Sequence, residues 1–555
     1  MKNKLIIAIL ILAAILRLAF LDIHPAGLNA DEAAIGYNAW SLIETGKDEH
    51  GVAWPLVFRS FDDYKPPLYF YIVLPFVKVM GLSVWSVRLP SALLGIASVF
   101  LIFLLTKRLF PDRKYLPGLS ALVLATSPWH LQFSRGGWEV NVATFFILLS
   151  IIFFLKSFEK PKHLFVFGIS TVLSLYTYHS ARIISPVLFI VFAIIYFDKV
   201  KWLFSKTNLK ITLSALALSI VLALPIVFQM FSAAGQSRFS GVSIFSDTGP
   251  VWEAENYRNE HKGTGQWANI FHNKYFTYGM RFSKNYLSHF SPDFLFTEGD
   301  AIARSKVPET GQSLLCLLPF FILGILNILK LNSKGKFVLL SWLFIAPLAA
   351  SITYQSPHAL RAQNMVIPLS IITAIGLLEF FQFIKKNLPK LSILISILVV
   401  AICSYNFIRY LNMYYVEYPQ RLPFAWQYGF DQIASYTSKY YKEYDKIIIS
   451  DRYDQPYILI AFFTKYPPER LQDDIVYSDP DKYGFSTGRK LGKYEFRAIN
   501  YEEDKSIPNA LLISAEEKVD DTKLINTIKS PSGDIMFKFS STSPSSLRGV
   551  LDEAN

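Results

Sequence analysis

The chain has 555 residues, of which 52% are hydrophobic, 15% aromatic and only 18% charged, and its mean hydropathy is +0.31. A soluble domain carries charge on about a quarter of its residues, so this composition excludes an ordinary soluble protein and indicates a chain that crosses a membrane several times. The net charge of +12 comes mostly from short loops between apolar runs, which is typical of membrane topology and not of a nucleic-acid-binding face.

The first apolar run, residues 5–21, follows Lys2 and Lys4. A basic start and an apolar centre are also features of a signal peptide. However, Arg17 interrupts the run, and no convincing small-residue cleavage site follows it. We therefore expect a retained first membrane helix, with a removed signal peptide as the alternative.

Further apolar runs follow, and together they predict an α-helical polytopic membrane protein with about eleven transmembrane helices. Their expected positions are 5–21, 87–106, 116–132, 138–156, 164–180, 182–198, 211–231, 313–330, 337–353, 364–384 and 391–411. Segment 66–82 is also apolar, but it is short and contains Pro75 and Lys78. We expect it to be an interfacial or re-entrant helix, because a full crossing, the alternative, would invert every later loop.

Every second loop of this scheme is rich in Lys and Arg. The basic loops are 107–114, 156–162, 198–210, 330–336 and 385–390. Since basic loops stay in the cytoplasm, the N-terminus is expected there and the other loops at the outer face. These include the first outer loop, 22–86, and a long loop, 232–312, whose length indicates a function.

The composition changes after about residue 411. Segments 445–451, 456–463 and 509–518 are typical of β-strands, with polar helical or turn segments between them. We therefore expect a membrane domain at 1–411 and a small extracytoplasmic α/β domain at 412–555.

Ionisable residues collect in the outer loops of this topology. They are Asp31, Glu32, Asp63, Lys65, Glu139, His179, Arg182, His358 and Arg361. Ionisable groups at membrane depth are costly and need partners or water, so this collection predicts a site at the outer surface. Carboxylates there could accept a proton from an acceptor, while Arg and Lys could hold a leaving phosphate. The pattern predicts group transfer from a lipid-phosphate donor.

Each of these residues also has a structural interpretation. Asp31 and Glu32 could simply favour the N-terminus of a helix that covers ADEAAIGYNAW, and for these two acids alone this interpretation is preferred. The cationic and histidine candidates could be interfacial or hydrogen-bonded structural side chains: Lys65, Arg182, Arg361, His179 and His358. The prediction of a site depends on the combination.

The Asp31-Glu32 pair and the element Tyr64-Lys65-Pro66-Pro67-Leu68 resemble the GT-C glycosyltransferases. The stretch RLPSALLG at 88–95 is also similar to that group. Within it, the chain resembles the protein O-mannosyltransferases and the lipid A aminoarabinose transferases, which are glycosyltransferase family 39-like. The resemblance covers residues 1–410 in layout, although its motifs lie within about the first 150 residues, and the C-terminal domain is similar to that of the aminoarabinose branch.

The resemblance implies a sugar donor linked to polyprenyl phosphate and an active site at the outer membrane boundary. Asp31 matches the family's base or acceptor-orienting aspartate, Glu32 its second acid, and Lys65 the lysine that approaches the donor phosphate. Glu139 is the candidate for a further acid, although SRGGWE departs from the usual pattern around it. The topology adds Arg182 and Arg361 as donor-phosphate ligands, and Asp63, His179 and His358 join Glu139 as candidate substrate contacts.

The sequence assigns no metal ligands. Some relatives hold a metal near the acid that precedes the lysine, but Tyr64 occupies that position, and no histidine pair has metal-ligand spacing. The two cysteines, Cys316 and Cys403, lie inside apolar runs and indicate neither a disulfide framework nor a thiolate site. A divalent metal stays an open alternative, and no other cofactor is expected.

The leading hypothesis is an inverting hexosyl or pentosyl glycosyltransferase in the cytoplasmic membrane. Its expected partners are the lipid-linked sugar donor, membrane lipids and an unidentified protein, lipid or glycan acceptor, with no nucleic acid. A lipid-linked sugar transporter or flippase is the rival hypothesis. It is disfavoured because a transporter places ionisable groups or broken helices near the bilayer midplane, whereas the ionisable residues here collect in the outer loops. A glycan ligase or polymerase is the alternative within enzymes.

Overall fold

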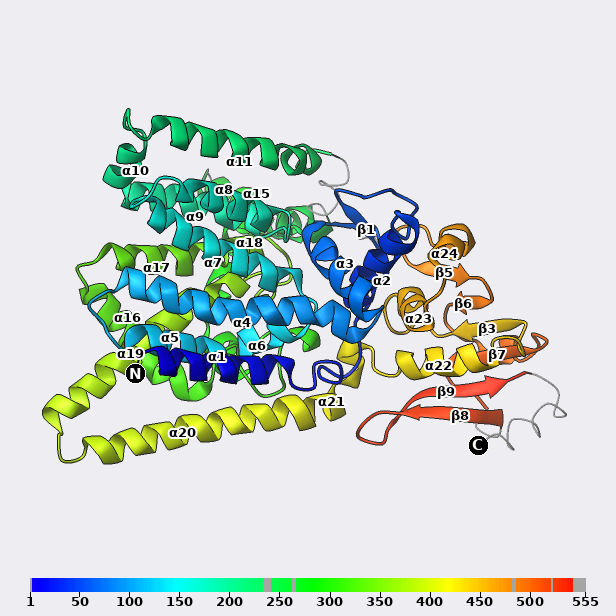
Figure 1. Cartoon of the computed structure of the whole chain (residues 1–555). Coiled ribbons are helices and arrows are strands. Elements are labelled where there is room, and N and C mark those ends of the chain that lie inside the picture. The colour runs from blue at the N-terminus through cyan, green and yellow to red at the C-terminus, as the bar shows by residue number, and fades with distance from the viewer. Residues whose placement is uncertain (1, 233–240, 262–265, 482–485, 521–522, 543–555) are drawn as a thin grey trace. The chain divides into compact units, whose positions relative to one another are not determined.

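The structure is a computed structural model that describes residues 2–232, 241–261, 266–481, 486–520 and 523–542 (Figure 1). The chain divides into two compact units, one made of Met1–Ala19 and Ser91–Tyr414, the other of Phe20–Pro90 and Tyr415–Asn555. The first outer loop thus groups with the C-terminal segment. The expected domain boundary at 411/412 stays a prediction.

The first unit is built from helices. In chain order they are α1 (Lys2–Leu18), α4 (Val84–Leu109, which begins in the other unit), α5 (Leu116–Ala125), α6 (Pro128–Arg135), α7 (Glu139–Ser157), α8 (His163–Leu175), α9 (Ala181–Ile195), α10 (Phe197–Leu203), α11 (Leu209–Met230), η1 (Ile244–Ser246), α13 (Gly249–Glu260), α14 (Gln266–Phe271), α15 (Lys274–Ser288), η3 (Asp293–Thr297), η4 (Ala303–Ser305), η5 (Leu315–Leu317), α16 (Leu318–Lys330), α17 (Lys334–Ile345), α18 (Leu348–Ser351), η6 (Gln363–Met365), α19 (Val366–Asn387) and α20 (Ser392–Asn412). Each of the eleven expected apolar runs contains a helix. Helix α16 packs on α19, and α7 packs on α8.

Within the described residues, six helical stretches are long and apolar enough to cross a membrane. They are Val84–Leu109, Glu139–Ser157, Leu209–Met230, Lys334–Ser351, Gln363–Asn387 and Ser392–Arg421. Helices α9 and α10, bent by 96°, would make a seventh if they form one span. The membrane-protein class is confirmed, whereas the number of about eleven spans stays a prediction.

The expected helix at 116–132 is broken between α5 and α6. Ser127 caps α6 by accepting a hydrogen bond from the backbone of His130, and Pro128 occupies the first turn, where its missing N–H is not needed. The carbonyl oxygens of Leu124 and Ala125 at the end of α5 accept hydrogen bonds from Arg17 at 3.4 and 3.2 Å. Arg17 therefore satisfies backbone groups that the break leaves open.

The second unit combines the first outer loop with an α/β domain. Its elements are α2 (Ala30–Thr45), β1 (Phe58–Ser60), β2 (Asp63–Lys65), α3 (Leu68–Met80), α21 (Tyr418–Arg421), η8 (Pro423–Trp426), α22 (Phe430–Tyr440), β3 (Lys446–Ile449), α23 (Pro456–Thr464), α24 (Pro468–Asp474), β4 (Ile475–Tyr477), β5 (Gly488–Leu491), β6 (Tyr494–Phe496), α25 (Tyr501–Asp504), β7 (Ala510–Ser514), β8 (Leu524–Lys529) and β9 (Ile535–Ser541), with η7 (Met413–Glu417) at its boundary. Helix α3 lies in segment 66–82 and has 13 residues; its interfacial role stays a prediction.

Within the described residues of this unit, seven strands form one mixed sheet in the order β4-β5-β6-β3-β7-β9-β8. Strand β3 pairs in parallel with β6 and β7, and the other pairs are antiparallel. Figure 1 shows β8 and β9 side by side, and β8 is the strand at this edge of the sheet. Residues 447–449 of β3 are fully buried, as expected of a central parallel strand.

The expected strands at 445–451 and 509–518 are confirmed as β3 and β7. The expected strand at 456–463 is wrong, because this segment forms helix α23. Its residues 456–462 are all buried, and α23 packs against α2, α22 and β5. A short apolar run that is buried on every side has no visible period, so hydrophobicity alone cannot distinguish helix from strand.

Candidate functional site

The N-terminus of α2 carries the two adjacent acids of the first outer loop. The side chain of Asn29 accepts a hydrogen bond from the backbone of Glu32 at 3.1 Å, and the Glu32 carboxylate accepts one from the backbone of Asn29 at 3.3 Å. This reciprocal capping box fixes the first turn. The helix expected at this position is confirmed, and Asp31 lies in its first turn.

Glu32 forms a buried ion pair with Arg88. The Arg88 Nε and Nη2 atoms donate to the two Glu32 carboxylate oxygens at 2.8 and 3.0 Å, and both side chains have no exposed surface. The other guanidinium donors go to carbonyl oxygens of Leu21, Pro25 and Gly27. The catalytic role of Glu32 stays a prediction, while its contacts support a positioning role. Sequence reasoning missed Arg88 as a site residue, although it begins the RLPSALLG stretch.

Asp31 pairs with Lys65. The Lys65 ammonium donates a hydrogen bond to Asp31 Oδ1. The Lys65 side chain is 7% exposed and that of Asp31 27% exposed, so the carboxylate stays partly accessible. The structure therefore brings the predicted base and the predicted phosphate-binding lysine into direct contact.

A β-hairpin positions Lys65. Strands β1 and β2 pair antiparallel, with Phe58 opposite Lys65 and Ser60 opposite Asp63. The turn residues Phe61 and Asp62 have φ values of 59° and 61°, as in the type I′ turns that suit tight hairpins. The Lys65 ammonium lies 5.4 Å from the centre of the Phe61 ring, within the range of a cation–π contact.

Glu49 is a buried carboxyl in the same loop that sequence reasoning did not single out. Its oxygens accept hydrogen bonds from the Asn38 amide at 2.8 Å and from the Tyr457 hydroxyl at 3.1 Å. Burial raises the pKa of Glu49 to about 7, although these hydrogen bonds and the charge of Lys65 oppose the rise. The signal available in the sequence was only the charged stretch KDEH at 47–50.

The remaining predicted residues belong to the first unit. Glu139 begins α7 and is buried, and His179 precedes α9. Arg182, in the first turn of α9, donates to the carbonyl oxygen of Leu175 at 3.4 Å. Because Asp31, Glu32, Asp63 and Lys65 belong to the second unit, the union of both groups in one site stays a prediction.

His358 and Arg361 lie on one loop that is held by buried polar groups. Asp300 accepts a hydrogen bond from the backbone of Ala359 at 2.6 Å, and its carboxylate lies 3.5 Å from His358 Nδ1. The backbone of His358 donates to His289 Nε2 at 3.1 Å. Burial raises the pKa of Asp300 and lowers that of His289 to about 4. Asp300 and His289 were not predicted, and their spacing in the sequence gives no signal.

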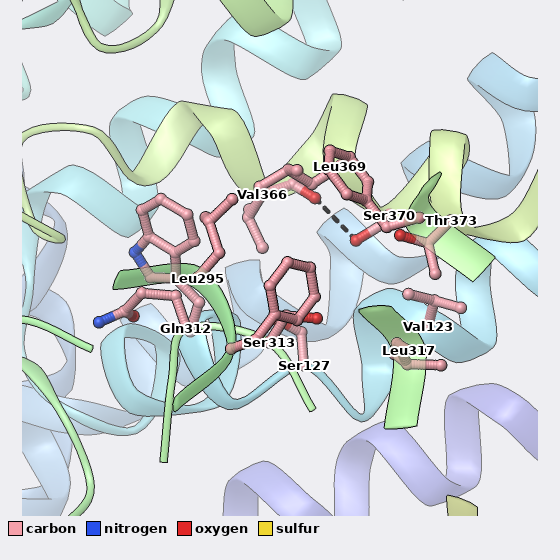
Figure 2. Close-up of a pocket in the computed structure, with 13 residues that line it drawn as sticks. Val123, Ser127, Leu295, Gln312, Ser313, Leu317, Val366, Leu369, Ser370 and Thr373 are labelled. Carbon is pink, nitrogen blue, oxygen red and sulfur yellow. Dashed lines mark hydrogen bonds between the residues drawn. The ribbon is translucent and has the colours of Figure 1, made fainter. Parts of the chain in front are cut away.

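A small cavity lies in the first unit, beside the break between α5 and α6. Its volume is about 20 Å³, enough for one water molecule. Figure 2 shows an apolar wall with the hydroxyls of Ser127, Ser370 and Thr373 among its lining groups. The Ser370 hydroxyl donates to the carbonyl oxygen of Val366 at 2.7 Å. None of the predicted site residues lines this cavity, so we assign it no part in the chemistry.

Within the described part of the chain, no group of three or more His, Cys, Asp or Glu side chains could hold a metal ion. Tyr64 stands where the family resemblance would place an acid, and a tyrosine hydroxyl is a weaker ligand than a carboxylate for a hard divalent cation. No step proposed below depends on a metal ion.

A family model described as dolichyl-phosphate-mannose-protein mannosyltransferase matches residues 64–227. Two proteins of Bacillus subtilis (strain 168) are similar to this chain: "Putative mannosyltransferase YkcB", 28% identical over 167 residues, and "Putative mannosyltransferase YycA", 30% identical over 166 residues. Each match covers 29% of this chain, and it spans only 22% of YkcB and 23% of YycA.

Two kinds of solved structure resemble the fold. ArnT from Cupriavidus metallidurans, bound to undecaprenyl phosphate, has a TM-score of 0.54 at 11% identity, over 97% of this chain and 98% of ArnT. The archaeal oligosaccharyltransferase AglB from Archaeoglobus fulgidus, in complex with an inhibitory peptide and a dolichol-phosphate, has a TM-score of 0.50 at 13% identity, over 83% of this chain and 63% of AglB. The expected GT-C type of fold is confirmed.

Proposed function

We propose that this protein is a GT-C glycosyltransferase that moves a sugar from a polyprenyl-phosphate-linked donor to an acceptor at the outer face of the cytoplasmic membrane. The observation that carries the proposal is the Asp31–Lys65 pair, which joins a proton acceptor to a phosphate-binding cation. The mannosyltransferase relatives support the reaction class. The lipid phosphates bound in the ArnT and AglB structures support the donor class.

In the proposed reaction, Asp31 accepts the proton of an acceptor hydroxyl or amine as that group attacks the sugar C1. The bond from C1 to the phosphate oxygen breaks, and its electron pair leaves with polyprenyl phosphate. Attack on the face opposite the phosphate inverts the configuration at C1. Lys65 stabilises the charge that develops on the leaving phosphate, which is often the largest contribution to such a rate.

The other residues have supporting roles in this proposal. Glu32 and Arg88 act as positioning residues, because their pair holds the start of α2 and the chain at residues 21–27 in place. Arg182 and Arg361 are proposed to contact the donor phosphate. The proposed substrate contacts are Asp63, Glu139, His179 and His358.

The proposed orientation places the C-terminal domain outside the cytoplasm. It is supported by the five basic loops that alternate with the outer loops along the chain. A polyprenyl-phosphate donor lies with its phosphate at the membrane boundary, so an outer-loop base and lysine would meet it there. The sugar, hexose or pentose, and the acceptor are left open by this proposal.

The test is sugar release from radiolabelled polyprenyl-phosphate monosaccharides in proteoliposomes. We expect the wild-type protein to consume one donor and release polyprenyl phosphate, and Asp31→Asn to lose at least about a hundredfold in rate, as is typical of a removed general base. Asp473→Asn, at an exposed position of α24, is the matched control and should keep the wild-type rate. Wild-type turnover by Asp31→Asn would contradict the base role, and movement of labelled lipid between leaflets without donor consumption would support a transporter.

A further inference from the structure

Asp31, the proposed base, and Lys65, the proposed phosphate-binding residue, form an ion pair with each other in the structure. The Lys65 ammonium donates to Asp31 Oδ1, so this oxygen is engaged before any substrate is present. A lysine that is bound to a carboxylate must also leave it, or share its donors, before it can bind a phosphate. The free site is thus held in a self-paired state.

We propose that the donor phosphate opens this pair: by taking over Lys65, it frees the Asp31 carboxylate to receive the acceptor's proton, so the donor binds before the acceptor can react. The proposal rests on the proposed function and adds an order of events to it. One anion, the phosphate, replaces another, the carboxylate, at the same ammonium, so the cation never loses a counter-charge.

The surroundings of Lys65 allow this exchange without a backbone movement. The strand pairing of the hairpin fixes its backbone, and the backbone of Ser486 donates to the Phe61 carbonyl oxygen at 3.3 Å. The Phe61 ring lies beside the ammonium and offers it a second favourable contact. Since lysine is a compact charge on a flexible stem with three donors, its tip can turn from carboxylate to phosphate while the ring contact is kept.

The position of Asp31 does not depend on its pairing with Lys65, so the carboxylate stays in place when the pair opens. It lies in the first turn of α2, where the helix dipole favours a negative side chain. The capping box and the Glu32–Arg88 pair fix this turn independently of Lys65. The Asp31 side chain has 27% of its surface exposed, so an acceptor can approach it and use the carboxylate once Lys65 has turned to the phosphate.

Sugar transfer and product release restore the Asp31–Lys65 pair. The acceptor proton moves to Asp31, the acceptor atom bonds to C1, and the C1–oxygen bond breaks with its electron pair on polyprenyl phosphate, which stays on Lys65. When this product leaves and Asp31 returns the proton to water, the ion pair forms again. An acceptor that arrives first meets an Asp31 carboxylate that is still paired with Lys65, so it has no free base until the donor phosphate has bound.

The experiment is zero-length crosslinking by a water-soluble carbodiimide, which joins a carboxylate to an amine in contact with it. We expect mass spectrometry of the free protein to find an amide between Asp31 and Lys65. Saturating polyprenyl phosphate should reduce this product at least about fivefold, since a ligand far above its Kd occupies nearly every site. Polyprenol, which lacks the phosphate, should not. The Lys446–Glu495 pair, at 2.8 Å on the sheet of the same unit, is the internal control and should crosslink equally in every sample.

Each outcome decides a different point. Absence of the Asp31–Lys65 product in the free protein, while Lys446–Glu495 forms, would overturn the self-paired state. Persistence of the product while bound radiolabelled polyprenyl phosphate is measured in the same sample would overturn the exchange but leave the proposed function intact. Failure of radiolabelled polyprenyl phosphate to bind at all would instead contradict the donor class, and the proposed function with it.

Discussion

Replacement of Glu49 by Gln tests whether a buried carboxyl makes the stability of the second unit depend on pH. Glu49 is buried, and its oxygens contact the Asn38 amide and the Tyr457 hydroxyl. Burial raises its pKa from the ordinary 4.5 to about 7. A glutamine has the same shape and keeps an acceptor for Asn38, so the substitution removes the charge with little change in packing.

The size of the effect follows from this pKa. Below pH 4.5 the carboxyl is protonated in both the folded and the unfolded chain, and it has no pH-dependent effect. Between pH 4.5 and 7 the unfolded chain binds fewer protons than the folded one, so the free energy of unfolding falls as pH rises. Above pH 7 the loss is complete and amounts to at most about 3 kcal/mol, at 1.36 kcal/mol for each pKa unit.

The assay is thermal unfolding in detergent, followed by tryptophan fluorescence at pH 5 and pH 8. We expect Glu49→Gln to gain stability relative to wild type as the pH rises, with the variant the more stable protein at pH 8. Asp473→Asn, at an exposed carboxyl of the same unit, should follow the wild type at both pH values. A difference between Glu49→Gln and wild type that is equal at pH 5 and pH 8, or smaller at pH 8, would refute the reasoning.

Three further predictions concern other buried or paired groups. Arg88→Ala should lower the free energy of unfolding by about 3–5 kcal/mol in chemical denaturation, because it leaves the Glu32 carboxylate buried without its partner. Asp31→Asn should cost less, because Asp31 is partly exposed and asparagine keeps an oxygen that can accept a hydrogen bond from Lys65. Lys65→Met should raise the KM for the lipid-linked donor more than tenfold, whereas Lys65→Arg should keep most of the affinity, because a positive charge is what binds phosphate. Equal KM values for Lys65→Met and wild type in the sugar-release assay would contradict the phosphate role of Lys65. Burial lowers the pKa of His289 to about 4. The neutral ring therefore contributes fully to stability above pH 6.5, and this contribution is lost as the pH falls towards 4. In thermal unfolding at pH 4.5 and 7.5, His289→Gln should lose less stability on acidification than the wild type.

The contacts of Glu32 and Asp31 separate two acids that look alike in the sequence. Glu32 is fully buried and bound on both oxygens, which suits a group that holds structure. Asp31 is partly exposed and pairs with the Lys65 ammonium, which suits a group that exchanges a proton. Adjacent positions in the first turn of a helix point in different directions, so a single residue step changes the environment completely.

Much of the helical part could be predicted from the sequence, because long apolar runs form helices wherever their backbone must satisfy its own hydrogen bonds. The same reasoning located β3 and β7, whose residues are β-branched or aliphatic between polar turns. It failed at 456–463, where burial on all sides hides the period, and it missed the break before Pro128, although Ser-Pro is a recognisable helix start.

The amino-acid sequence was enough to predict the membrane class and the eleven apolar runs that contain helices, and to propose candidate site residues, since apolar length and motif chemistry are properties of short stretches of chain. Only the tertiary structure decided which charges meet. Lys65 reaches Asp31 across 34 residues and Arg88 reaches Glu32 across 56, and burial around Glu49 moves its pKa to about 7. Partnership and burial depend on how distant segments pack, and no local pattern carries that information.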